Sequence, residues 1–86
     1  MASYTRSRDQ HWVRDKDVDG IVVVLEDHSM WEVHPSDRWM TARWLRMSTI
    51  IVECTEKEGY PYLLKNATEE EISRANYLGD LAPIAE

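Results

Sequence analysis

Cysteine, glycine and phenylalanine are scarce in this chain, which has one, three and none of them in 86 residues. Because a disulfide needs two thiols, Cys54 cannot form one within the chain, and a lone thiol is typical of a reducing compartment. The longest uninterrupted apolar run, residues 21–25, is far too short to span a bilayer, and the first residues lack a secretory signal pattern. The sequence therefore predicts a cytoplasmic protein that does not associate with membranes.

Positive charge is also in deficit, with 10 Lys and Arg against 16 Asp and Glu and a formal net charge of −6. Affinity for phosphates depends on Lys and Arg displacing counterions, so this balance argues against a general nucleic-acid binder. Residues 1–16 are locally basic, however, because they hold Arg6, Arg8, Arg14 and Lys16 against Asp9 and Asp15.

The remaining composition is that of a folded globular domain, with 43% apolar and 30% charged residues. A chain of this length has room for one core only. We expect a flexible leader at residues 1–9, a single domain at residues 10–80 and a flexible tail at residues 81–86. Domains this small often gain stability from a metal or a partner subunit.

The clearest structural signal is a β-hairpin. Residues 21–25 are a β-branched run, and residues 30–34 form a second arm that Pro35 ends. A two-residue turn at Asp27 and His28 would place Val24 opposite Trp31. One face of the hairpin would then carry Val22, Val24, Trp31 and Val33, and the other Ile21, Val23, Leu25 and Met30. Both faces are apolar, so we expect the second to be covered by a helix, a loop or a neighbouring subunit.

Further strand patterns occur at residues 11–14, 50–55 and 60–65, and residues 38–46 have roughly helical spacing. Residues 68–78 fit two structures, a short helix that begins with a capping box at Thr68 or a closing strand. The predicted fold is mainly β: a small, strongly bent antiparallel sheet or SH3-like barrel of four or five strands with one or two short helical turns.

Two short motifs flank Trp44. Residues 31–35 have the form W-x-V-x-P at the end of the hairpin, and residues 60–66 have the form Y-P-Y-x-L-x-N. This arrangement resembles a family of small uncharacterised bacterial proteins over about residues 18–78. The resemblance implies a bacterial source, a compact β-barrel and a strand after Asn66, and it implies no activity. The chain departs from the pattern at His28, where the resembling sequences favour Gly.

No constellation in the sequence indicates catalysis, so we do not expect an enzyme. The glycines are too far apart for a phosphate-binding loop. His28, Glu32 and His34 have an unspecific spacing that favours solvated side chains over a zinc site, and we predict no metal or cofactor. Cys54 follows Ile50 and Val52 at alternate positions, which favours a buried structural thiol.

Candidate partner-binding residues fall in two stretches. Residues 38–46 interleave three arginines with two tryptophans, the residue types that dominate interfaces and stack on bases. The favoured interpretation is that Met40 and Trp44 fill the core while the arginines are solvated, and the alternative is partner binding through an exposed Trp39. Tyr60 and Tyr62 suggest an aromatic surface, with half-buried or core tyrosines as the favoured alternative. The candidates are Arg38, Trp39, Arg43, Arg46, Tyr60 and Tyr62.

The leading functional prediction is a module that binds another protein or a second copy of itself, because the hairpin is apolar on both faces and the chain carries four tryptophans. The alternative is a small nucleic-acid-binding barrel that uses Arg38, Trp39, Arg43 and the basic leader.

Overall fold

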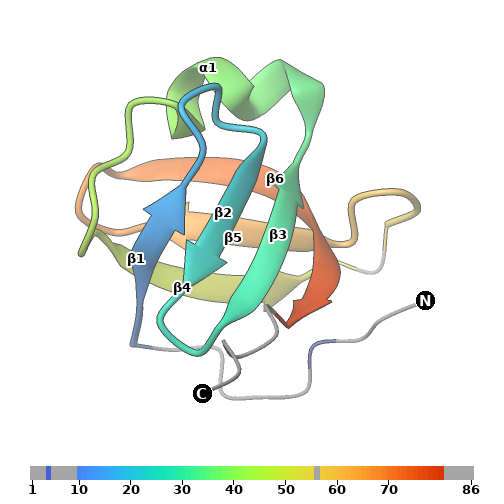
Figure 1. Ribbon diagram of the computed structural model, residues 1–86. Coiled ribbons are helices and arrows are strands. Elements are labelled where there is room, and N and C mark those ends of the chain that lie inside the picture. Colours follow the sequence, from blue (N-terminus) through green and yellow to red (C-terminus); the bar gives the residue numbers. More distant parts are fainter. Residues whose placement is uncertain (1–3, 5–9, 56, 81–86) are drawn as a thin grey trace.

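The computed structural model describes Tyr4, residues 10–55 and residues 57–80, and these form a closed six-stranded antiparallel barrel (Figure 1). Within these residues no helix is long and apolar enough to cross a membrane. The chain order is β1 (His11–Lys16), β2 (Val22–Leu25), β3 (Ser29–Val33), the 3₁₀ turn η1 (Pro35–Asp37), α1 (Arg38–Thr41), β4 (Thr49–Cys54), β5 (Tyr62–Asn66) and β6 (Glu71–Asp80).

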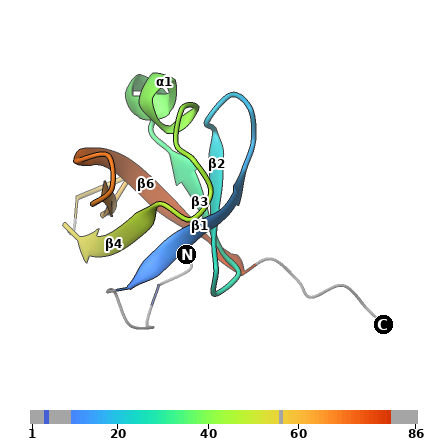
Figure 2. The same ribbon diagram turned by 90° about the vertical axis from the view of Figure 1, so that its left-hand side faces the viewer.

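The barrel consists of two three-stranded meanders joined along both edges. The spatial order is β1-β2-β3-β6-β5-β4, and β4 pairs back with β1 through His11 and Trp12. The second meander runs across the first, as both views show (Figures 1 and 2). The prediction of a small, mainly β barrel with a short helical stretch is confirmed, although the barrel has six strands where four or five were expected.

The additional strand is β6, which decides between the two structures considered for residues 68–78. This ten-residue strand pairs with β3 on one side and β5 on the other. The residues that suggested a helix start form the β5–β6 turn instead. Asn66 Oδ1 accepts a hydrogen bond from the Glu69 amide at 2.9 Å, and Glu70 has a positive φ of 57°. Pairing on both edges outweighs the local helical pattern.

The β2–β3 hairpin is confirmed, but its predicted register is wrong by one residue. Val23 lies opposite Trp31 and Val24 opposite Met30. The loop has three residues rather than two, and its last residue, His28, adopts a left-handed φ of 72° and donates its amide proton to the carbonyl of Leu25 at 2.9 Å. This shift of one residue exchanges the two faces of β2 relative to β3. Val23 and Leu25 are therefore buried, while Val22 and Val24 are half-buried on the outside.

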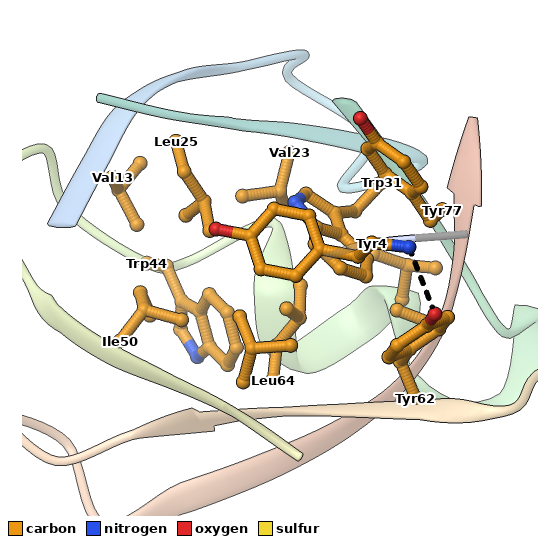
Figure 3. Close-up of a cluster of buried hydrophobic side chains, with 13 residues drawn as sticks. Tyr4, Val13, Val23, Leu25, Trp31, Trp44, Ile50, Tyr62, Leu64 and Tyr77 are labelled. Carbon is orange, nitrogen blue, oxygen red and sulfur yellow. Dashed lines mark hydrogen bonds between the residues drawn. The ribbon is translucent and has the colours of Figure 1, made fainter. Parts of the chain in front are cut away.

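Trp31 lies in the middle of an aromatic core (Figure 3). Its ring centroid is 5.0 Å from that of Tyr4, 5.1 Å from that of Tyr77 and 5.2 Å from that of Tyr62. The indole Nε1 donates to Ser29 Oγ at 2.8 Å. The other buried apolar residues of this core are Val13, Val23, Leu25, Val33, Trp44, Ile50, Val52, Leu64 and Ala75, with half-buried Cys54 packed against them.

Tyr4, which lies within the predicted flexible leader of residues 1–9, is a core residue. Its side chain is 4% exposed, and its backbone amide donates to the hydroxyl of Tyr62 at 3.0 Å (Figure 3). The sequence offered no periodic apolar pattern around this single aromatic residue. The other leader residues, and the predicted tail at residues 81–86, lie outside the described residues.

The helical stretch predicted within residues 38–46 is present as α1, which covers one end of the barrel (Figures 1 and 2). It packs on the β1–β2 turn, where Thr41 Oγ1 donates to the carbonyl of Gly20 at 2.7 Å. Lys16 Nζ donates to the carbonyl of Ala42 at 2.8 Å. Trp44, just after α1, is buried in the core.

Asp37, at the end of η1, fastens this helical region to β6. Its Oδ2 accepts from the backbone amide of Arg74 at 2.8 Å and from Arg74 Nε at 3.0 Å, and its Oδ1 accepts from Nη2 at 3.1 Å. Burial opposes ionisation of Asp37, but the hydrogen bonds and positive charge of Arg74 outweigh it and hold the pKa of this carboxyl below its ordinary value.

We expect Asp37 to contribute to acid sensitivity. Because its pKa is lower in the folded than in the unfolded chain, its stabilisation is complete above the unfolded pKa of about 3.9 and is lost as pH falls through the folded pKa. Asp37→Asn should therefore unfold more easily at pH 7 and lose less additional stability on acidification. Urea unfolding at a series of pH values measures this, with Asp19→Asn in an exposed turn as the control. Parallel pH profiles for Asp37→Asn and the parent would contradict it.

Candidate functional site

The residues around α1 divide into buried and exposed side chains. Met40, Thr41 and Trp44 are buried against the barrel. Trp39, Leu45 and Met47 are 66%, 67% and 70% exposed, respectively. The helix has only four residues and an irregular segment follows it. The barrel can therefore cover one side of this region but not both. Large apolar side chains are therefore presented to solvent along the segment of residues 39–47.

Charged groups accompany the exposed tryptophan. The guanidinium of Arg43 lies 5.3 Å from the ring centroid of Trp39, in cation–π geometry. Arg43 Nη2 also pairs with Glu71 Oε2 at 3.0 Å, and the other oxygen of Glu71 accepts from Trp44 Nε1 at 2.8 Å. Glu71 thus connects the exposed and buried sides of this segment.

A second ion pair joins the same segment to β1. Arg46 Nη2 lies 3.3 Å from Asp15 Oδ1, and both side chains are mostly exposed. The backbone amide of Lys16 and the side chain of Arg46 lower the pKa of Asp15. We use the name α1 surface for the exposed side chains of residues 39–47 together with their two ion-pair partners; the group is Trp39, Arg43, Leu45, Arg46, Met47, Asp15 and Glu71. Its charges cancel, with two guanidinium groups and two carboxylates.

Three of the six candidate binding residues belong to this group: Trp39 and Arg43 are in contact with each other, and Arg46 pairs with Asp15 further along the same segment. Arg38 does not, because it is half-buried and its Nε donates to the carbonyl of Val33 at 2.9 Å, with Nη2 3.8 Å from Glu32 Oε2. Arg38 therefore supports the fold.

The two tyrosine candidates do not form a shared surface. Tyr62 is a core residue, which was the favoured alternative, and its burial makes it inaccessible to a partner. Tyr60 precedes β5 and is half-buried, with its ring centroid 4.8 Å from that of His34. The burial of both residues matches the favoured alternative of core and half-buried tyrosines, and Tyr60 and Tyr62 do not act as the candidate aromatic surface.

A second polar cluster lies at the other end of the barrel, where β1 begins and the β2–β3 loop turns (Figure 1). His11 Nδ1 lies 2.9 Å from both carboxylate oxygens of Glu26, and His11 Nε2 lies 2.8 Å from the hydroxyl of Tyr4. The Tyr4 hydroxyl donates to Asp27 Oδ2 at 2.5 Å. Burial opposes ionisation of Asp27, but hydrogen bonds from Ser29 and Tyr4 outweigh it and lower the pKa of Asp27.

The sequence did not predict this cluster. In the described part of the chain, His11, Glu26 and Asp27 are the one group of three metal-ligating side chains that converge, whereas His28, Glu32 and His34 do not. Only knowledge of how β1 pairs with β2 would have indicated this cluster. Val13 lies opposite Leu25, which places the start of β1 beside the hairpin loop.

The strand topology defines the chain as a small closed antiparallel β-barrel. No protein-family model, no curated protein and no solved structure matches it. The resemblance to small bacterial proteins stays a prediction.

Proposed function

We propose that this protein is an interaction module in which the α1 surface of one copy binds the α1 surface of a second copy. The observation that carries the proposal is the presence of three large apolar side chains, each about two-thirds exposed, within nine residues of one segment. Exposed apolar side chains bordered by charged groups are typical of protein-binding sites.

The residue types on this surface favour protein binding. Trp and Arg are the side chains that contribute most to protein interfaces. Burying a side chain of the size of Trp39, Leu45 or Met47 is favourable by about 1.5–3 kcal/mol before the costs of association. Arg43 is held over Trp39 and against Glu71, so less conformational freedom is lost when a partner covers it.

The charges on the surface favour a second copy as the partner. A two-fold interface brings the same patch of both copies together, so the patch must be complementary to itself. Arg43 and Arg46 are matched by Asp15 and Glu71, and two copies can exchange these pairs across the axis. The two arginines and two carboxylates of the α1 surface have no net charge together, so the excess negative charge of the chain comes from other residues. Two copies that meet through these groups are therefore not repelled by a charge of one sign.

The same pairs make the alternative, nucleic acid, a poorer partner. A phosphate that approaches Arg43 or Arg46 must displace a carboxylate that remains nearby and repels it. Stacking of a base on Trp39 is compatible with its exposure, but the ring is already in contact with Arg43.

Sedimentation equilibrium over about 1 µM to about 1 mM tests the proposal, since weak interfaces associate in this range. We expect a concentration-dependent monomer–dimer equilibrium. Trp39→Ser should raise the dissociation constant at least about tenfold, as the loss of a central tryptophan does at other interfaces. Trp12→Ser is the matched control, because Trp12 is an exposed tryptophan of β1 outside the α1 surface.

Two results would contradict this function. One is a strictly monomeric protein over the whole range, or equal weakening by the Trp39 and Trp12 variants. The other is salt-sensitive binding of single-stranded RNA that Trp39→Ser abolishes, which would assign the segment to nucleic acid.

A further inference from the structure

The cluster at the barrel end opposite α1 brings a histidine nitrogen and two carboxylates close together. Tyr4 donates its only hydroxyl proton to Asp27, so its oxygen can only accept from His11, and Nε2 of His11 must carry a proton. A neutral imidazole in this tautomer has its lone pair on Nδ1. That lone pair would face the carboxylate of Glu26 at 2.9 Å. A second ring proton, or a metal cation in its place, would convert this contact into an attractive one.

The donor atoms on that side are spaced as metal ligands. One atom each from His11, Glu26 and Asp27 lie within 4.8 Å of one another. His11 Nδ1 is 2.9 Å from the Glu26 oxygens and 4.0 Å from Asp27 Oδ2. A tetrahedral ion with bonds of about 2.0–2.2 Å places its ligands roughly 3.4 Å apart. Side-chain shifts of under about 1 Å would bring all three into such a shell.

Supporting hydrogen bonds hold each ligand in position. Tyr4 orients the imidazole through Nε2, as a second-shell partner of a metal-bound histidine does. Asp27 Oδ1 accepts from the amide of Ser29 at 3.0 Å and from its hydroxyl at 2.6 Å. Glu26 Oε1 accepts from the backbone amide of Trp12 at 3.0 Å. These bonds leave the ligand-bearing groups facing one another.

We propose that His11, Glu26 and Asp27 form a binding site for a divalent transition-metal ion, with Tyr4 as the residue that positions the imidazole. One imidazole and two carboxylates suit zinc, manganese or ferrous iron better than the all-oxygen shells of magnesium and calcium. The ion would replace the proton on Nδ1. The side chains of His11, Glu26 and Asp27 are 7%, 20% and 14% exposed, which shields the ion while leaving an approach through the carboxylates.

Calorimetric titration of the full chain with Zn²⁺ tests the site, with Mg²⁺ as the comparison ion. We expect one zinc per chain and at least tenfold weaker binding of Mg²⁺. Glu26→Gln keeps the size of the side chain but removes a charged ligand, and it should weaken zinc binding at least about tenfold. Tyr4→Phe should weaken it as a loss of second-shell support.

Two matched controls separate this site from surface binding. Glu53→Gln removes an exposed carboxylate that pairs with Lys65, and His34→Gln removes a half-buried imidazole; both should bind zinc like the parent. Circular dichroism shows whether each variant is folded, and side-chain NMR of the three histidines reports which ring binds. Absence of stoichiometric zinc binding to the parent would overturn the proposal. Equal weakening by the Glu26 and Glu53 variants, or shifts at His28 or His34 in place of His11, would also overturn it.

Discussion

Replacing Gly20 with alanine is expected to leave the domain largely unfolded. Gly20 has a φ of 73°, and a Cβ built there would lie 2.4 Å from the carbonyl oxygen of Arg38 and 2.5 Å from the amide nitrogen of Ala42. These are backbone atoms of the α1 region, so they cannot rotate away as a side-chain end can. The left-handed conformation and the overlap together should cost about 3 kcal/mol or more.

Gly59 and Gly79 are the matched controls for this prediction. Both have positive φ, at 81° and 107°, but a Cβ at either position meets no atom within 4 Å. Gly59→Ala should therefore cost only the backbone term of about 1 kcal/mol. Urea unfolding followed by circular dichroism compares the three variants. If Gly20→Ala were no less stable than Gly59→Ala, the close packing of α1 on the β1–β2 turn would be wrong.

Trp31→Ala should remove a comparable share of the stability. Trp31 is 0% exposed and is surrounded by the rings of Tyr4, Tyr62 and Tyr77. Truncation of a buried tryptophan costs about 3–5 kcal/mol, because the transferred surface is lost and a cavity remains. Small domains have stabilities near the low end of about 5–15 kcal/mol, so this variant is expected to be mostly unfolded at 37 °C.

Two other tryptophan variants check the reason for that loss. Trp31→Phe keeps an aromatic ring but removes the Nε1 bond to Ser29, so its loss of stability should be clearly smaller than that of Trp31→Ala. Trp12→Ala, at an exposed position on β1, should change the free energy of unfolding by less than about 1 kcal/mol. A Trp12 variant as unstable as Trp31→Ala would contradict the position of the core.

The hairpin shows what the sequence could and could not predict about the fold. The β-branched run and the following arm identified both strands correctly. The register could not be predicted, because residues 21–25 are apolar at every position and burial of either face fits the pattern equally well. The loop decided it, since His28 adopts a left-handed conformation that makes the loop three residues long.

Residues 71–80 show the limit of local patterns. Thr68 and Glu71 match a helix start, and only pairing with β3 and β5, distant in sequence, makes this segment a strand. Tyr4 escaped prediction for the same reason, because a single aromatic residue has no periodicity and its core position comes from contacts across the barrel.

The candidate sites were partly predictable. The Arg and Trp stretch indicated the α1 segment, and exposure of Trp39 was one of the two alternatives considered. The sequence did not indicate which arginines support the fold and which are exposed. Arg38 donates to the carbonyl of Val33, whereas Arg43 lies over the ring of Trp39, and both contacts depend on the tertiary structure. The metal-site proposal involves His11, Glu26 and Asp27, which are brought together by strand pairing and carry no recognisable spacing.

The central claim is that the α1 surfaces of two copies meet, and intermolecular NMR contacts test it most directly. In an equimolar mixture of isotope-labelled and unlabelled protein, filtered spectra detect only contacts between different copies. We predict contacts from the Trp39 ring of one copy to the side chains of Leu45 or Met47 of the other. Intermolecular contacts confined to the outer face of β2 and β3, around Val22 and Val24, would contradict the claim, as would their complete absence at millimolar concentration.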